Sequence, residues 1–278
     1  MAIGPIAIVT MLTADLEKSQ NMYSQAFNWQ ITNRDEIVTE IEARRWGSER
    51  LLGAKTVSVT GINGSVRFIE SLDIAKTQPL RTYGWTALEI CVDDVFAYTD
   101  QAIAAGFELL NEPVALSGTG QPLPLIAAQL AGPNGEVVYI TQILSEVPNF
   151  ELPDVKTESG SIFICVLGAS DLEKSRAVLE SNFQLRRASD REVAIKVLNR
   201  VYGNDLATLH RLSSLQLNGR NAIEIDQLPS SASPREKQAG QLVPGISMVS
   251  VISNKEIAEV LELPDGALLE LLPADYQY

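Results

Sequence analysis

Ala14-Asp15-Leu16-Glu17-Lys18-Ser19 returns later in the chain as Ser170-Asp171-Leu172-Glu173-Lys174-Ser175, so that Asp171 follows Asp15 by 156 positions. The surroundings repeat as well, because an apolar run precedes each copy and Asn-Trp-Gln-Ile at 28–31 is answered by Asn-Phe-Gln-Leu at 182–185. Self-similarity at a fixed offset indicates duplicated structural units. The sequence therefore predicts two related halves.

Each half divides again into two units with the same order of elements. In the first half, the apolar run 85–92 precedes Asp93-Asp94 and a helical stretch, and a Pro133-Asn134-Gly135 turn then leads into the apolar run 137–143. In the second half, the apolar run 245–252, a helical stretch at 257–261 and the turn Pro264-Asp265-Gly266 follow the same order. We predict an α+β protein of four units, each with a strand, a helix opened by a polar capping residue and further strands.

The segment from Glu146 to Gly160 is the predicted linker between the halves. It contains Pro148 and Pro153 and few apolar residues, which is typical of a connection between domains. We therefore expect one domain of two units at residues 1–146. A second domain, at residues 159–278, also has two units, of which the last is abbreviated. Halves of this size match the usual size of a single domain.

Composition narrows the classes of partner and compartment. A net charge of −13, with 35 acidic and 22 basic residues, argues against a nucleic-acid or anionic-membrane partner. No apolar stretch reaches the roughly 18 residues of a membrane span, and the N-terminus lacks the pattern of a signal peptide. Cys91 and Cys165 lie in apolar strand patterns, which favours buried, reduced thiols. We expect a cytoplasmic protein, either a monomer or a homodimer.

The repeated pattern resembles a known superfamily. A strand, an Asp-Leu-Glu-Lys-Ser helix start, an aromatic residue on that helix and a closing Pro-Asn/Asp-Gly turn are similar to the vicinal oxygen chelate proteins. These include glyoxalase I, extradiol dioxygenases and bleomycin-resistance proteins. The resemblance covers nearly the whole chain. It implies four βαβββ modules, paired into two glyoxalase-like domains whose curved mixed sheets form cups for a small organic ligand.

The resemblance also implies a divalent metal held by two His, Gln or Glu residues and one further Glu. Carried over onto this chain, those positions fall on residues that are mostly apolar or small: Ile8, Ala87 and Tyr139 in one set, and Ile164, Ser247 or Met248, and Glu270 in the other. The single histidine, His210, matches none of them. We therefore predict a protein without a metal or other cofactor. An all-oxygen site made by Glu224, Asp226 and Glu270 is the alternative.

Strand alternation predicts which residues line the cups, because successive side chains point to opposite faces of a sheet. In the first half, the predicted ligand-binding residues are Arg67, Trp85, Glu89, Tyr139 and Thr141. In the second half they are Glu224 and Glu270, with Asp226 on the same face as Glu224. These carboxylates, if they do not face solvent at the rim, share one concave surface.

Two classes of function fit these residues. The first is a metal-independent protein that sequesters or carries a small organic molecule. The alternative is a metal-free lyase or isomerase in which Glu89 and Tyr139 are the catalytic acid–base pair, and a metal-dependent dioxygenase or glyoxalase-type enzyme ranks third. Burial beside Trp85, Ala87 and Cys91 is expected to raise the pKa of Glu89. We predict that Glu89→Gln impairs binding or turnover and leaves stability unchanged or improved.

Overall fold

Three aspartates begin three equivalent helices. Their side chains accept hydrogen bonds from backbone amides in the first helical turn, with Asp15 preceding α1 (Leu16–Phe27), Asp94 preceding α3 (Val95–Ala104) and Asp171 preceding α5 (Leu172–Asn182). These bonds satisfy amides that have no partner within the helix, and each carboxylate meets the positive end of the helix dipole. The helix starts predicted from the repeated phrase are therefore confirmed.

A computed structural model describes residues 1–74, 77–118 and 121–276, which contain fifteen strands and six α-helices. The first module has β1 (Ile3–Thr13), α1, β2 (Gln30–Ile37), α2 (Glu40–Arg45), the 3-10 helix η1 (Glu49–Leu51), β3 (Lys55–Thr60) and β4 (Ser65–Glu70). The second has η2 (Pro79–Arg81), β5 (Gly84–Val92), α3, β6 (Glu108–Gly118), β7 (Gln121–Ala131) and β8 (Val137–Ile143). The third has α4 (Val155–Glu158), β9 (Ser161–Ala169), α5, β10 (Arg186–Val193), α6 (Lys196–Tyr202), β11 (His210–Gln216) and β12 (Ala222–Gln227).

The fourth module is shorter and differs from our expectation. It consists of β13 (Ile246–Ser253), β14 (Glu259–Glu262), the 3-10 helix η3 (Pro264–Gly266) and β15 (Leu268–Leu272). The helix predicted at 257–261 is wrong, because Val260 and Leu261 pair antiparallel with β15. A stretch of this length forms too few helical hydrogen bonds to offset the cost of starting a helix.

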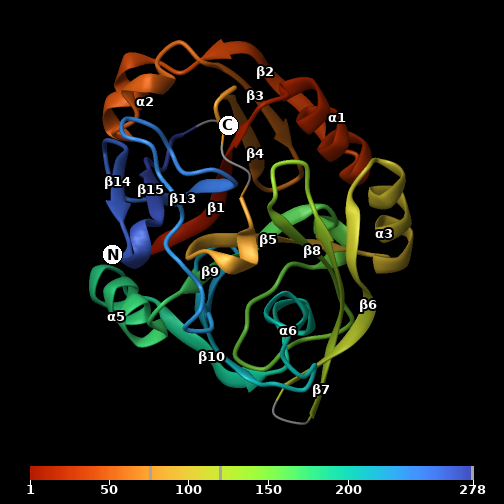
Figure 1. The fold of residues 1–278 in the computed structure, drawn as a ribbon. Helices are drawn as coiled ribbons and strands as arrows, with labels where there is room; N and C mark the ends of the chain where they lie inside the picture. The colour runs from red at the N-terminus through yellow and green to blue at the C-terminus, as the bar shows by residue number, and fades with distance from the viewer. Residues whose placement is uncertain (75–76, 119–120, 277–278) are drawn as a thin grey trace.

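The strands form two mixed sheets, and each sheet takes modules from both halves of the chain (Figure 1). The first sheet has the order β14-β15-β13-β1-β4-β3-β2, and the second has the order β10-β11-β12-β9-β5-β8-β7-β6. The halves meet where β1 pairs antiparallel with β13 and where β5 pairs antiparallel with β9. We expected the modules of one half to pair with each other. The sheets cross the predicted boundary between residues 146 and 159 instead.

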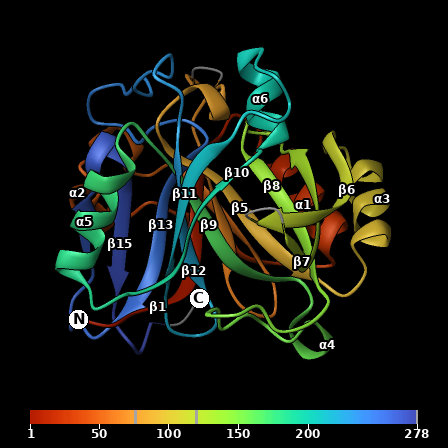
Figure 2. The same ribbon diagram turned by 90° about the horizontal axis from the view of Figure 1, so that it is seen from below.

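One hydrophobic core joins the two sheets. The largest cluster of buried apolar side chains includes residues from α1, α3 and α5 and from strands of both sheets. Tyr23 of α1 lies in it with Phe27, Phe68 and Phe107, and its hydroxyl donates to the buried carboxylate of Glu136 at 2.7 Å. Figure 1 shows α1 and α3 side by side, and Figure 2 shows α4 and α6 at opposite ends of the second sheet. Within the described residues, no helix is long and apolar enough to cross a membrane.

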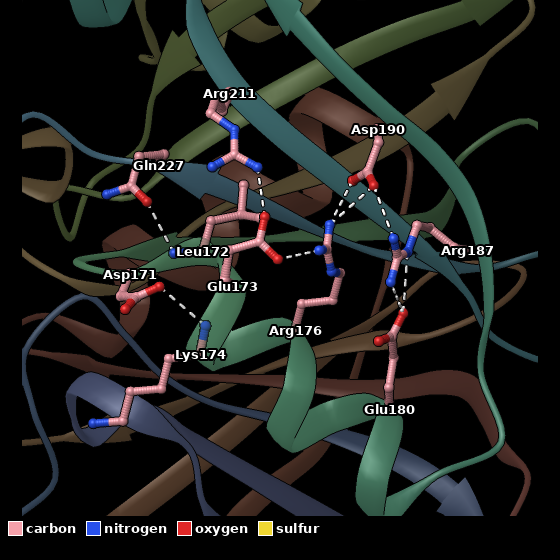
Figure 3. A network of polar contacts seen from close by, with 10 residues as sticks. All are labelled: Asp171, Leu172, Glu173, Lys174, Arg176, Glu180, Arg187, Asp190, Arg211 and Gln227. Carbon is pink, nitrogen blue, oxygen red and sulfur yellow. Dashed lines mark hydrogen bonds and ion pairs between the residues drawn. The ribbon is translucent and has the colours of Figure 1, made fainter.

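Helix α5 is tied to β10 by a network of ion pairs (Figure 3). Arg176 is buried; it donates to both carboxylate oxygens of Asp190, at 2.8 and 2.9 Å, and also contacts Glu173. Arg211 contacts the other oxygen of Glu173 from β11. Because Arg191 follows Asp190 on β10, its side chain points to the opposite face of the strand. The network therefore fixes the strand that presents Arg191 to the concave side of the second sheet.

Replacing Arg176 should measurably weaken this attachment. We expect Arg176→Met to lower the free energy of unfolding by about 1–3 kcal/mol, because the buried guanidinium loses its hydrogen bonds to the exposed carboxylates of Asp190 and Glu173. Arg211→Met removes a half-exposed ion pair to the same Glu173 and should cost less than about 1 kcal/mol. Urea unfolding of both variants measures the difference. Equal losses would show that burial of Arg176 adds nothing to the network.

Candidate ligand-binding site

A cavity of about 250 Å³ lies over the concave face of the second sheet. Its floor comes from the central strands β5, β8, β9 and β12, and its walls come from β6, β7, β10 and the segment between β8 and α4. Of the residues predicted to bind ligand, the structure brings four to this cavity: Glu89, Tyr139, Thr141 and Glu224. They come from both halves of the chain, so neither half forms the cavity alone.

The polar end of the cavity is built by strand register. Glu89 on β5 pairs with Tyr139 on β8. On the other side of each strand, Glu89 pairs with Ile164 of β9, and Tyr139 pairs with Gln129 of β7. The Thr141 hydroxyl donates to Glu89 at 3.2 Å, and the Ser214 hydroxyl donates to Glu224 at 3.4 Å. Glu89 is 93% buried, with 7% of its surface exposed. The cavity thus ends in two carboxyl groups and a phenol.

The electrostatics of this end favour protonated carboxyl groups. Burial, with the nearby charge of Glu224, raises the pKa of Glu89 to about 8, although Thr141 and Arg191 act in the opposite direction. Burial also raises the pKa of Glu224 and, together with the charges of Glu224 and Glu89, raises the pKa of Asp226 well above its ordinary value. The pKa of Tyr139 is raised well above its ordinary value by burial and by these carboxylates. Groups with such shifts in a cavity are candidates for function.

The rest of the cavity lining is mostly apolar. It includes Val147, Phe150 and Leu152, and all three belong to the segment that the sequence predicted to be a linker. Leu123 and Leu125 of β7 and Phe163 of β9 also line the cavity. The connection between the halves therefore also forms a wall of the cavity. A cavity with an apolar body and a few polar groups at one end is the usual form of a small-molecule site.

Trp85 does not lie in this cavity, contrary to our expectation. Its side chain is buried in the core with Leu88 and Ile90, and its indole N–H donates to the Leu268 carbonyl oxygen at 2.7 Å. The register between β5 and β9 shifts between Trp85 and Ala87, where β5 has one extra residue. Such a bulge interrupts the alternation of faces. Trp85 and Ala87 therefore face different sides of the sheet, which simple alternation does not anticipate.

Arg67 and Glu270 lie in the first sheet, away from Glu89. Glu270 is fully buried and accepts hydrogen bonds from the Trp46 indole at 2.8 Å and from Ser250 at 2.7 Å. Arg45 lies 2.9 Å and Arg67 3.7 Å from its carboxylate oxygens. We call Arg45, Trp46, Arg67, Ser250 and Glu270 the first-sheet cluster. The predictions that Arg67 shares a cup with Glu89, and Glu270 one with Glu224, are wrong because modules of different halves pair.

The first-sheet cluster lies beside a second cavity, of about 490 Å³, that Arg67 lines together with Ile8 and Ser65. Arg67 lies over the Trp46 ring, 4.6 Å from its centroid, and donates to Thr10 at 2.9 Å. The Trp46 side chain packs with Ala43 of α2 in a separate apolar cluster. Each charged group therefore has a partner within the chain. This arrangement is that of a structural ion-pair cluster, in which Arg45 and Arg67 share Glu270 and Arg67 also lies 3.6 Å from Glu42.

The residues present do not fit the metal implied by the resemblance. Among residues 1–74, 77–118 and 121–276, no group of three or more His, Cys, Asp and Glu side chains is placed to hold a metal ion. His210 is buried beside α6, where its Nε2 lies 2.7 Å from the Asn199 side-chain oxygen, and it does not line the cavity. Glu224 and Asp226 lie on β12, in a different sheet from Glu270, so the all-oxygen alternative is wrong.

Arg191 is the main residue that sequence reasoning missed. It lines the cavity from β10, and its charge lowers the pKa of Glu89, Glu224 and Asp226 against the larger effect of burial. The alternation of β10 contains the signal, because Arg191 and Val193 share one face. Whether that face lines the cavity depends on how β10 pairs with β11. The paired residues are 17 or more positions apart in the chain, so the local sequence pattern does not show this pairing.

Comparison with known proteins identifies the fold. The sequence matches no protein-family model and no curated protein. Glyoxalase I from Zea mays superposes with a TM-score of 0.60 at 13% identity, covering 96% of this chain and 91% of that chain. A putative dioxygenase from Bacillus subtilis superposes with a TM-score of 0.62 at 9% identity, covering 99% and 86%. The chain has the vicinal oxygen chelate fold. At these identities the likeness establishes the fold alone.

Proposed function

We propose that the protein binds a small organic molecule in the second-sheet cavity and sequesters or carries it without a metal ion. The observation that carries this proposal is the cavity itself, with its apolar walls and with Glu89, Tyr139, Thr141 and Glu224 at one end. The first sheet also has a cavity, of about 490 Å³, but Arg67 on its lining is paired with the buried carboxylate of Glu270.

Capture of metabolites by the purified protein tests this proposal. The protein is incubated with a cell extract, washed and denatured, and the released molecules are identified by mass spectrometry. Ala115 lines the cavity and is exposed, so Ala115→Trp should block the cavity at little cost in stability. Ala97 is exposed on α3, and Ala97→Trp is the matched control. We expect one class of molecule to be captured by the wild type and Ala97→Trp and to be lost in Ala115→Trp. Capture by all three proteins would contradict the proposal.

A metal-free lyase or isomerase is the second candidate, and one observation favours it. Glu89 lies opposite Tyr139 in the register, and its pKa of about 8 suits a group that exchanges protons near neutral pH. If this function is correct, a captured molecule incubated with the protein in D₂O should gain deuterium at carbon, and Glu89→Gln should abolish the exchange. Return of the molecule unlabelled and unchanged would favour the carrier role.

Metal content is a separate prediction. Because the family's metal positions in both sheets hold mostly apolar or ion-paired residues, we expect purified protein to contain no stoichiometric Fe, Zn, Mn or Ni by elemental analysis. Treatment with EDTA should leave the captured molecule bound. One tightly held metal ion per chain, with loss of the captured molecule on chelation, would overturn this prediction and favour a metal-dependent enzyme.

A further inference from the structure

The two sheets place different residues at matching positions. In the first sheet Ile8 pairs with Ser250, and Ser250 pairs with Glu270. In the second sheet Ile164 pairs with Glu89, and Glu89 pairs with Tyr139. Glu89 therefore corresponds to Ser250, and Tyr139 corresponds to Glu270. Both sheets carry buried carboxyl groups at the centre of the concave face. We can therefore compare which positively charged groups lie near these carboxyl groups in each sheet.

The first sheet obtains its positive charge from its own chain. Arg45, at the end of α2, lies 2.9 Å from Glu270. At the offset of 156 residues the matching position on α6 holds Val201, which has no charge. The α6 segment instead packs through Leu198 and Tyr202 into a separate apolar cluster with Leu228. The α6 segment thus supplies no positive charge at the position that Arg45 occupies in the first sheet.

The polar end of the second-sheet cavity has unbalanced charge and unpartnered atoms. Glu89 and Glu224 line the cavity, and Asp226 lies near them without lining it. Among the described residues, the guanidinium of Arg191 acts on all three carboxyl groups, while Lys196 is exposed on the lining at the N-terminal end of α6. Asp226 is 6% exposed, and among the described residues its Oδ1 and the Nε of Arg191 have no hydrogen-bond partner. Asp226 shares a strand face with Glu224, two residues away on β12. Buried polar atoms in this state are rare in native proteins. Within the described part of the chain, Asp226 Oδ1 lacks a donor, whereas Arg191 Nε lacks an acceptor.

We propose that the second-sheet cavity takes an organic cation, a molecule whose ammonium or amidinium head lies at Glu89 and Glu224. Its apolar body lies along Leu123, Phe150 and Phe163, which line the same cavity. This inference rests on the proposed function, because it names the class of molecule that the cavity binds. In this proposal the cationic head of the ligand supplies a positive charge to the second sheet, as Arg45 does for the first sheet.

Protonation of the carboxyl groups gives the proposal a pH signature. Without a cation, the pKa of about 8 keeps a proton on Glu89 near neutral pH, and the pKa of Asp226 is raised in the same direction. A bound cation favours the ionised carboxylates, so binding releases protons and the affinity increases as the pH rises. Glu224, Tyr139, Arg191 and Lys196 are the other titratable groups on the lining. An alkylammonium keeps its charge through this range, and burial with the nearby carboxylates raises the pKa of Tyr139 well above its ordinary value.

Three probes with one apolar body test the class of head group: phenylbutylamine, phenylbutanol and phenylbutyrate. Each is titrated into the full-length protein by calorimetry, in two buffers with different heats of ionisation. We expect the amine to bind about tenfold or more tightly than the alcohol, and the carboxylate to bind most weakly. Amine affinity should rise between about pH 6 and about pH 8, with proton release seen as a buffer-dependent heat.

Two variants should change the affinity for the amine in opposite directions. Glu224→Gln removes a carboxylate and should weaken amine binding while leaving alcohol binding unchanged. Arg191→Gln removes the competing guanidinium and should strengthen amine binding, which a merely structural role of Arg191 does not predict. Circular dichroism confirms that each variant is folded, and Arg191→Gln keeps the test decisive if Glu224→Gln fails to fold.

The outcomes separate this inference from the proposed function. If the alcohol or the carboxylate binds as tightly as the amine and Ala115→Trp blocks it, the cavity binds small molecules and the cation is the wrong class. If none of the probes binds, or if Ala115→Trp leaves amine binding intact, both proposals are overturned. Amine preference that is lost in Ala115→Trp supports both.

Discussion

Glu270→Gln is expected to lower the free energy of unfolding by about 3–5 kcal/mol, because removing one partner of a buried ion pair leaves the other charge uncompensated. Glu270 is fully buried, and Arg45 and Arg67 both lie beside its carboxylate. Arg67 is 7% exposed and keeps only Glu42 as a charged neighbour, at 3.6 Å. Urea unfolding monitored by tryptophan fluorescence measures the loss, since Trp46 itself donates to Glu270.

The control is an ion pair in the neighbouring helix. Glu40 and Arg44 of α2 form an exposed pair at 2.6 Å, and Glu40→Gln should change the free energy of unfolding by less than about 0.5 kcal/mol. Below its unfolding temperature, Glu270→Gln should still bind the molecule captured by the wild type. A stable Glu270→Gln protein that no longer binds it would move the binding site to the first sheet.

The sequence predicted much of this fold because helix caps and strand alternation depend on residues that are close together in the chain. Asp15, Asp94 and Asp171 cap helices through residues two or three positions away. Alternation also predicted that Glu89 and Tyr139 share a face, since both lie on strands with regular register at those positions. Their role in ligand binding stays a prediction. These predictions depend on the spacing of cap residues and on the alternation of side chains along a strand, and both can be read from one sequence.

The failures of prediction depend on contacts between distant parts of the chain. Arg67 and Glu89 are separated into two sheets because the modules pair across the halves, and each module carries similar strand edges that the sequence does not distinguish. Trp85 lies on the face opposite to the predicted one because of a bulge that forms where β5 pairs with β9. The linker likewise carries Phe150, whose place in the cavity wall becomes defined only when both halves form one sheet.

Glu89→Gln should stabilise the protein at alkaline pH and leave it nearly unchanged at acid pH. Below about pH 4.5 the carboxyl group is protonated in both the folded and the unfolded state, so it does not affect the balance between them. As the pH rises, the unfolded state loses this proton first, because in the folded state the pKa is about 8. The folded state then binds more protons, and stability falls with rising pH until Glu89 ionises in both states.

The expected size follows from the difference between these pKa values. We expect Glu89→Gln to raise the free energy of unfolding by about 2–4 kcal/mol at about pH 8.5, because part of the full linkage is shared with Glu224 and Asp226. Glu256→Gln, at an exposed position, is the matched control and should leave the pH profile unchanged. Urea unfolding at several pH values measures all three proteins. Parallel profiles for Glu89→Gln and the wild type would show that Glu89 ionises as an ordinary carboxyl group in the folded protein. The proton release expected on binding of an organic cation would then have no source at Glu89.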